Sequence, residues 1–168
     1  MVREIEDHYG RLDILVNNAG SFVNRLTLDE MTEEVWDRVM EVNPKSVYLC
    51  SQAVLPVMRR QGGGRIVNMT SISARNGGSP DSIAYSTAKG GVSTLTRAMA
   101  KDLVADGILV NAVAPGRIDT PLHDEFTPDG SGERPRRASR WEGKEPPKKS
   151  SGLSCSWSLR SPTTSSAR

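Results

Sequence analysis

The chain has 168 residues and a formal net charge of +2, which indicates a single domain of near-neutral total charge. The charge is unevenly spread, because residues 1–126 hold 13 basic and 16 acidic side chains whereas residues 127–168 hold 9 and 4. No apolar run approaches the roughly 18 residues that a membrane span requires, and the start MVREIEDHYG is too charged for a signal peptide, so we expect a cytoplasmic protein with no membrane partner.

The first predicted strand covers residues 12–16, after a charged helical stub over residues 2–9 that Gly10 ends. Its run of aliphatic residues, bounded by turn formers, is typical of a strand buried on both faces. The segment Asn17-Asn18-Ala19-Gly20 follows directly. Small residues and amides at this place let a ligand approach the backbone closely, although a simple turn is an equally weighted alternative.

A long helix is predicted over residues 33–59, either as one helix or as two nearly collinear ones. Thr32 is suited to cap its start, because the hydroxyl can accept from backbone N–H groups of the first turn. Pro44 lies in the middle, where a proline removes a backbone donor and crowds the carbonyl four residues earlier, so we expect a kink beside Asn43. An amide and a freed carbonyl at a kink could hold a water molecule, although most kinks serve packing.

The second predicted strand covers residues 65–69 and follows a glycine-rich turn at residues 61–64. The turn does not match a phosphate-binding loop, because it precedes the strand and no Gly-Lys-Ser/Thr follows it. Thr70 and Ser71 close the strand, and hydroxyls at the carboxyl end of a strand lie where α/β sheets bind ligands. Residues 74–82 are predicted to form a loop.

Tyr85 and Lys89 stand four residues apart at the start of a second helical pattern, which ends before Gly107. This spacing places both side chains on one helix face, about 6 Å apart along the axis. An ammonium so close favours the phenolate, so we expect the pKa of Tyr85 to lie below its usual value of about 10. Such a tyrosine can pass a proton to or from an alcohol or carbonyl oxygen. For an isolated pair, an ordinary tyrosine beside a solvated lysine is the alternative.

A third strand is predicted over residues 108–114 and ends at Pro115-Gly116. The alternation of strands and helices along the chain is typical of an α/β protein with a parallel sheet and right-handed crossovers.

Taken together, these segments resemble the short-chain dehydrogenase/reductase family, whose members include ketoacyl-carrier-protein reductases. No single motif of the chain is specific for this family, but the occurrence of all of them in the family's order is specific. The resemblance rests on LDILVNNAG (12–20), Val42-Asn43, GRIVNMTS (64–71), YSTAK (85–89) and NAVAPGRIDT (111–120).

The resemblance implies a catalytic role for four residues. Tyr85 is expected to be the general acid or base, Lys89 to lower its pKa and hold the nicotinamide ribose, and Ser71 to donate a hydrogen bond to the substrate carbonyl. Ser71 precedes Tyr85 by 14 residues, one more than is commonest in the family, which implies an insertion in the loop between them; Ser73 is the less favoured alternative. Asn43 matches an asparagine that anchors a proton-relay water.

NAD or NADP is the cofactor that the resemblance implies. The residues that match the walls of its site are Asn17, Ala19 and Gly20 on the adenosine side, and Pro115, Gly116, Ile118 and Thr120 beside the nicotinamide, together with Tyr85 and Lys89. No metal ligands are expected. One departure from the family pattern is Pro44, which stands where a leucine is usual.

The resemblance covers about residues 2–120 and lacks the family's first βαβ units, their glycine-rich pyrophosphate-binding turn and the last strand. We therefore expect an α/β fold with an incomplete Rossmann-like parallel sheet flanked by helices, in a partial domain over residues 1–126. Residues 127–168 contain ten serines and five prolines with few aliphatics, and we expect a disordered tail of frame-shifted or alternatively spliced origin. The tail has no aromatic-interleaved motif, so no nucleic-acid partner is expected.

The implied function is NAD(P)-dependent oxidoreduction of a small-molecule alcohol/carbonyl pair by hydride transfer. The alternative is an inactive homologue that lacks the phosphate-binding turn and acts, if at all, by association. Family members pair through helices that match those at 33–59 and 85–106, so a homo-oligomer is an expected form. The strand at 12–16 is expected to be a bare apolar sheet edge, which favours association.

Overall fold

The computed structural model describes residues 1–116, and the predictions made for residues beyond Gly116 lie outside this range. The elements follow in the order α1 (Val2–Tyr9), β1 (Ile14–Asn17), α2 (Glu33–Met40), α3 (Ser46–Arg60), β2 (Gly64–Met69), α4 (Ser73–Asn76), α5 (Ile83–Leu103) and β3 (Ile108–Val113). A π-helical turn (Glu41–Lys45) joins α2 to α3, and a 3₁₀ turn (Val104–Asp106) follows α5.

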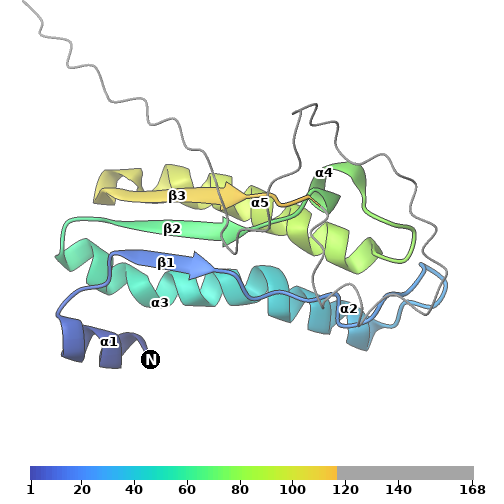
Figure 1. Ribbon diagram of the computed structural model, residues 1–168, viewed down its shortest axis with the longest axis horizontal. Coiled ribbons are helices and arrows are strands. Elements are labelled where there is room, and N and C mark those ends of the chain that lie inside the picture. Colours follow the sequence, from blue (N-terminus) through green and yellow to red (C-terminus); the bar gives the residue numbers. More distant parts are fainter. Residues whose placement is uncertain (117–168) are drawn as a thin grey trace, which may run out of the picture. The chain divides into compact units, whose positions relative to one another are not determined.

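The three strands form one parallel sheet in the order β1-β2-β3, as the alternation of strands and helices predicted (Figure 1). The register pairs Leu15 with Ile66 and Ile66 with Val110, so these three side chains point to the same face. Helix α3 packs against β1 and β2, and α5 packs against β2 and β3. The strand carboxyl ends therefore meet at one edge of the sheet, next to the start of α5.

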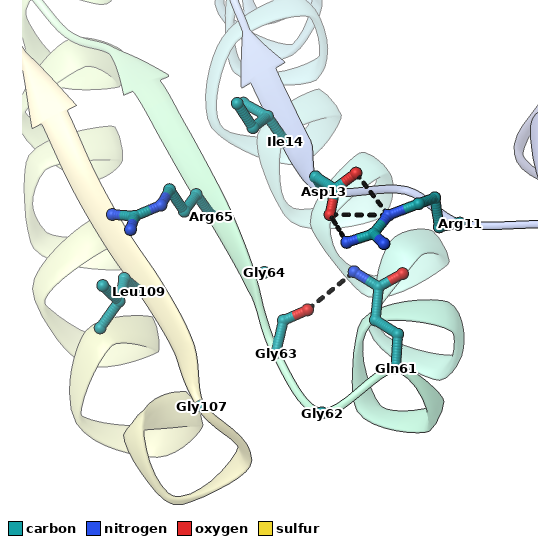
Figure 2. A pocket seen from close by; sticks show the side chains of 10 residues that line it. All are labelled: Arg11, Asp13, Ile14, Gln61, Gly62, Gly63, Gly64, Arg65, Gly107 and Leu109. Atoms are coloured by element: carbon teal, nitrogen blue, oxygen red, sulfur yellow. Dashed lines mark hydrogen bonds and ion pairs between the residues drawn. The ribbon is translucent and has the colours of Figure 1, made fainter. Parts of the chain in front are cut away.

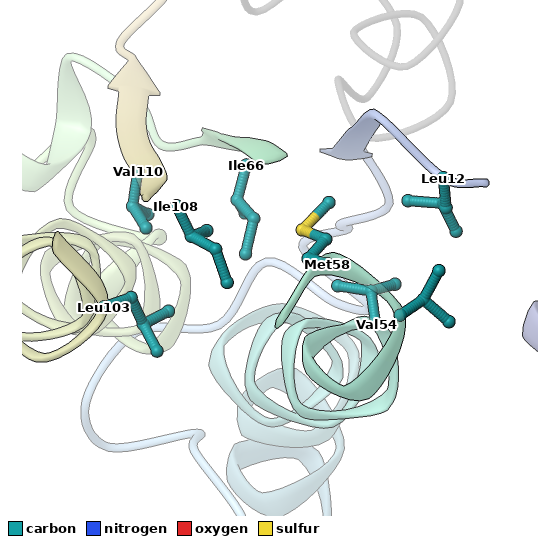
Figure 3. Packing of buried hydrophobic residues seen from close by; sticks show 8 residues of the cluster. Leu12, Val54, Met58, Ile66, Leu103, Ile108 and Val110 are labelled. Atoms are coloured by element: carbon teal, nitrogen blue, oxygen red, sulfur yellow. The ribbon is translucent and has the colours of Figure 1, made fainter. Parts of the chain in front are cut away.

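The main apolar core lies between the sheet and these two helices (Figure 3). Met58 of α3, Ile66 of β2 and Leu103 of α5 are almost fully buried in it. The core orients α5 against β2, and this contact positions the residues at the start of α5.

The opposite face of the sheet is open, so the prediction that β1 is buried on both faces is wrong. Ile14 and Val16 of β1 are 58% and 55% exposed, and Leu109 of β3 is 45% exposed. The physical reason is that both crossover helices lie on the other face. Strand β1 pairs only with β2 among the described residues, which agrees with its expected place at a sheet edge.

Two other boundaries differ from prediction. Strand β1 begins at Ile14 because the backbone N–H and C=O of Leu12 are bonded to the side-chain amide of Gln61, at 3.1 and 2.8 Å, instead of to a neighbouring strand. The predicted loop over residues 74–82 contains the end of α4, whose last turn Gly77 terminates in a left-handed conformation with φ of 83°.

The predicted kink at Pro44 is a π-helical turn, and Thr32 caps the start of α2 by accepting from the Val35 N–H. Pro44 has no N–H, so the regular hydrogen bond to the carbonyl four residues earlier cannot form. A wider turn accommodates this loss without ending the helix. Within residues 1–116, no helix is both long and apolar enough to cross a membrane.

Candidate active site

The carboxyl end of the sheet brings together all four residues predicted to be catalytic. Ser71 follows the end of β2, Tyr85 and Lys89 lie in the first turns of α5, and Asn43 lies in the π-helical turn. Gly20 of the segment after β1 lies next to Asn43 and Lys89. Parallel strands and the helices that follow them produce this convergence, because each connection leaves the sheet at the same edge.

Tyr85 is half-buried, and its phenol lies close to the Ser71 side chain. Burial raises the pKa of Tyr85 above its usual value, and the nearby Ser71 hydroxyl opposes this rise only in part. The prediction that Lys89 lowers the pKa of Tyr85 is therefore wrong for the chain as it stands. The Lys89 Nζ atom lies 5.6 Å from the centre of the Tyr85 ring and donates a hydrogen bond elsewhere.

Lys89 is a buried ammonium with a single hydrogen-bond acceptor in the described part of the chain. Its residue is 4% exposed, and Nζ donates to the backbone carbonyl of Met69 at 2.8 Å. Burial lowers the pKa of Lys89 to about 8. Two of the three N–H bonds of Nζ have no acceptor among residues 1–116, so they are available to a ligand or a water molecule.

Asn43 is fully buried, and its amide orientation is fixed by two carbonyls. Its Nδ2 atom donates to the carbonyls of Val39 and Ser21, both at 2.9 Å. The nitrogen must therefore be the atom that faces these carbonyls. The Oδ1 atom is buried without a hydrogen-bond partner in the described chain. Because a buried acceptor without a donor is costly, this oxygen indicates a place where a donor binds.

Gly20 leaves space between Asn43 and Lys89. A Cβ atom at Gly20 would lie 2.7 Å from both Asn43 Oδ1 and Lys89 Nζ. Any side chain at this position would therefore collide with both polar atoms. Glycine at this position therefore lets the backbone after β1 approach both polar atoms closely.

Asn17 occupies the core rather than the surface of the site. Its Nδ2 atom donates to Asn68 Oδ1 at 2.8 Å and to Ser51 Oγ at 3.1 Å, and Asn68 in turn donates to Thr96 Oγ1 at 2.9 Å. This buried network joins β1 and β2 to α3 and α5. The side-chain nitrogen of Asn17 is thus committed to the fold, whereas Ala19 is exposed at the end of the same segment.

The remaining predicted site residues lie at and beyond the end of β3. Pro115 is half-buried and Gly116 exposed, and the carbonyl of Pro115 accepts a hydrogen bond from the Ile72 N–H at 3.0 Å. That bond joins the segment after β3 to the segment after β2. Ile118 and Thr120 lie outside the described residues.

Two side chains near Tyr85 were not predicted from the sequence. The Phe22 ring stacks on the Tyr85 ring, and the Arg25 guanidinium lies on the Phe22 ring. No periodicity or motif signals these contacts, because they join a loop after β1 to the start of α5. The sequence feature that comes nearest to indicating them is the position of Phe22, a large aromatic residue two positions after the segment 17–20, which was expected to approach a ligand.

A separate open pocket lies at the opposite end of the sheet (Figure 2). Its lining includes Gly64 at the start of β2 and Gly107 just before β3, and none of the four predicted catalytic residues is part of it. Its Arg11 is paired with Asp13, with 2.5 Å between Nη2 and Oδ1. The predicted chemistry therefore belongs to the carboxyl edge of the sheet and not to this pocket.

This architecture defines an α/β protein of Rossmann-like type, and comparison with known proteins identifies its family. A sequence model described as short chain dehydrogenase matches residues 1–130. The chain belongs to this family of oxidoreductases.

Individual relatives agree with the family assignment. The chain is 44% identical over 128 residues to the short-chain reductase protein NovJ of Streptomyces niveus, covering 76% of this chain and 48% of that protein. It is 43% identical over 126 residues to the 3-oxoacyl-[acyl-carrier-protein] reductase FabG of Thermotoga maritima, covering 75% and 50%. The crystal structure of acetoin dehydrogenase from Enterobacter cloacae superposes with a TM-score of 0.65 and 42% identity, covering 74% and 49%. The chain thus spans about half the length of the relatives it matches.

Proposed function

We propose that this chain carries the proton-transfer half of an NAD(P)-dependent site that interconverts a small alcohol and a carbonyl compound, with Tyr85 as the general acid or base. The observation that carries the proposal is that Ser71, Tyr85 and a buried Lys89 ammonium converge at the carboxyl end of a parallel sheet, with Lys89 Nζ 5.6 Å from the centre of the Tyr85 ring. Family membership supports an oxidoreductase; the cofactor and the role of Tyr85 are our proposal.

In the reductive direction, Tyr85 donates its phenolic proton to the substrate carbonyl oxygen. A phenol is protonated near neutral pH, which is the form that an acid must have. Ser71 donates a hydrogen bond to the same oxygen and stabilises the negative charge that develops there. When bound, the nicotinamide supplies the hydride that is added to the carbonyl carbon, so hydride and proton together give the alcohol. In the oxidative direction Tyr85 takes the proton from the alcohol.

The residues around Gly20 fit the polar part of such a cofactor and a proton relay. The two available N–H bonds of Lys89 can donate to a ribose hydroxyl and to a water molecule. A water bound between Lys89 Nζ and Asn43 Oδ1 would accept from Lys89 and donate to the orphan Oδ1 of Asn43. After Tyr85 has donated its proton to the substrate, its phenolate would be reprotonated through these hydrogen bonds.

The other walls of the cofactor site are proposed by correspondence with the family pattern. Asn17 and Ala19 would contribute on the adenosine side, the former through its backbone, and Pro115 and Gly116 beside the nicotinamide. Ile118 and Thr120 would continue that wall. We also propose a cytoplasmic location and a homo-oligomeric form.

An inactive homologue that acts by association is the second candidate. It is supported by one observation: within residues 1–116, no glycine-rich turn joins the end of a strand to the start of a helix, so the described part supplies no pyrophosphate site. The only triple-glycine segment precedes β2.

Calorimetric titration of the purified chain with NAD(H) and with NADP(H) separates the two candidates. Micromolar binding that Lys89→Met and Gly20→Ala both weaken, while Lys101→Met on the same helix does not, would support the proposal. No binding by a sample with the circular dichroism and cooperative melting of a folded protein would contradict it and favour the inactive homologue.

A further inference from the structure

An aromatic and cationic stack covers one side of Tyr85. The Phe22 and Tyr85 ring centres are 3.9 Å apart with 26° between the ring planes, so the rings lie face to face. On the far side of Phe22, the Arg25 guanidinium carbon lies 4.5 Å from the ring centre. Phe22 is 7% exposed and thus buried between a cation and the proposed proton donor.

The segment that carries Phe22 is anchored to the loop before α5. Arg25 Nη1 contacts Asp81 Oδ1 at 3.3 Å and Ser79 Oγ at 3.2 Å, and the Leu26 N–H donates to the Asp81 carbonyl at 3.1 Å. The Arg25 side chain is 19% exposed, so this ion pair is partly shielded from water. These contacts join the loop after β1 to the start of the helix that carries Tyr85.

The backbone next to Phe22 is held in an uncommon conformation. Val23 has φ of 62°, in the left-handed region that β-branched residues rarely adopt. Its N–H donates to Ser21 Oγ at 3.1 Å. A residue in this region costs of order 1 kcal/mol or more, and it persists only where surrounding contacts determine the conformation. The Arg25 and Phe22 stacks are contacts of that kind.

We propose that Phe22, held from behind by Arg25, is a positioning residue that fixes the ring plane of Tyr85 so that its hydroxyl faces Ser71. A tyrosine side chain has only two main torsions, so confining the ring face leaves the direction of the hydroxyl determined. This inference rests on the proposed function only in taking Tyr85 as the proton donor. The stack itself is a property of the chain without cofactor or substrate.

Three charged side chains of residues 1–116 matter for the environment of the Tyr85 ring. Lys89 lies one helical turn further along α5, Arg25 lies behind Phe22, and Asp81 pairs with Arg25 in the preceding loop. The stack therefore acts through packing and exclusion of water more than through a charge on the phenol. Phe22→Leu keeps most of the volume and removes the ring, whereas Phe22→Trp restores an aromatic face.

NMR of the full chain with ring-labelled tyrosine tests the inference without cofactor. The chain has three tyrosines, and comparison with Tyr85→Phe assigns the signal of Tyr85. We expect the Tyr85 ring protons to be shielded by Phe22, to move downfield in Phe22→Leu and to return upfield in Phe22→Trp. Arg25→Met, which keeps the stem but loses the charge, should give an intermediate shift. The signal of Tyr48, which is 48% exposed on α3, serves as an internal control.

A second readout separates positioning from general packing. In Phe22→Ala water reaches the ring, so Tyr85 should titrate at lower pH than in the parent chain, whereas Leu28→Ala, at a 71% exposed position of the same loop, should not change it. Where turnover is measurable, Phe22→Leu should lower kcat by about 10- to 100-fold with little change in cofactor affinity. An unchanged Tyr85 spectrum in Phe22→Leu overturns the inference. Absence of turnover in the parent chain counts against the proposed function instead, because the NMR readout does not depend on catalysis.

Discussion

Lys89 destabilises the folded chain in the absence of a ligand, because its charge is buried. Its ammonium is buried, no carboxylate pairs with it within residues 1–116, and a single carbonyl accepts from it. A charge held in this way disfavours the folded chain, because desolvation is offset only in part by one hydrogen bond. The proposed ribose and water contacts would supply the missing acceptors.

The first prediction is that Lys89→Met stabilises the chain without ligands by about 2 kcal/mol at pH 7, because it removes a buried charge and keeps an apolar stem. The pKa of Lys89 is about 8 when folded and 10.5 in its usual state. The unfolded chain therefore binds more protons between these values, so the stability of the parent chain should rise with pH from about 8 towards 10.5.

Urea unfolding across this pH range measures both effects. The rise should be absent in Lys89→Met, and Lys101→Met, at an exposed position of α5, should change stability by less than about 0.5 kcal/mol. The raised pKa of Tyr85 acts in the opposite direction only above its usual value of 10.0. A Lys89→Met chain that is less stable than its parent at pH 7 would show that the ammonium is better satisfied than the structure indicates.

At the scale of single elements, Asn43 determines the shape of the joint between α2 and α3. Its side-chain N–H groups donate to the carbonyl of Val39, next to the turn where Pro44 has no N–H, and to the carbonyl of Ser21 in the loop after β1. The same amide leaves its oxygen directed towards Gly20 and Lys89. One residue thus stabilises the wide turn and provides the acceptor of the proposed relay.

The second prediction is that Asn43→Ala lowers the free energy of unfolding by about 2–4 kcal/mol, because two buried carbonyls lose their donor and a cavity forms. Asn43→Asp should be at least as destabilising, since a carboxylate would face both carbonyls. Asn24→Ala, at an exposed position, should change stability by less than about 0.5 kcal/mol in the same chemical denaturation. Equal stability of Asn43→Ala and Asn24→Ala would mean that the turn forms without the amide.

The elements themselves were largely predictable from the sequence. Helical spacing located α5 and the α2–α3 pair, and aliphatic runs bounded by turn residues located all three strands within two residues. Spacing also placed Tyr85 and Lys89 on one helix face. Helical spacing could not show which group accepts the hydrogen bond of the Lys89 ammonium, because the acceptor, the Met69 carbonyl, belongs to β2 and is 20 residues away in sequence. The predicted lowering of the Tyr85 pKa failed because burial of the phenol, which helical spacing does not show, raises the pKa instead.

Contacts between loops were not predictable in the same way. Phe22 and Arg25 belong to a segment without periodicity, and their partners lie in a different loop and on α5. The burial of the strands was also misjudged, because an aliphatic run does not tell whether one or both faces of a sheet are covered.

At the scale of the whole described unit, the open sheet face exposes apolar side chains of β1 and β3. Ile14 and Val16 of β1 lie on it beside a strand edge that has no partner within residues 1–116. An apolar face next to a free edge favours association with another chain. This feature connects the fold to the proposed oligomeric form.

The third prediction is that Ile14→Lys with Val16→Lys reduces self-association, because charges on the open face oppose close packing. Sedimentation velocity over a concentration series should show a smaller average mass for this double variant than for the parent chain. A matched variant with Tyr9→Lys and Leu28→Lys adds the same charge at two exposed apolar positions off the sheet and should leave association unchanged. Equal effects of both variants would assign the change to net charge rather than to this face.

We propose that Tyr85 transfers the proton in an alcohol/carbonyl interconversion, and turnover of the purified chain and its Tyr85→Phe variant tests this role. Nicotinamide absorbance is followed with a panel of small ketones, diketones and 3-oxoacyl thioesters, and folding of both chains is checked by circular dichroism. We predict that the parent chain reduces at least one of them and that Tyr85→Phe lowers kcat by about 10²- to 10⁴-fold, the usual contribution of a positioned acid. Turnover that is equal in the two chains, or none in a folded chain that binds the cofactor, would contradict the account.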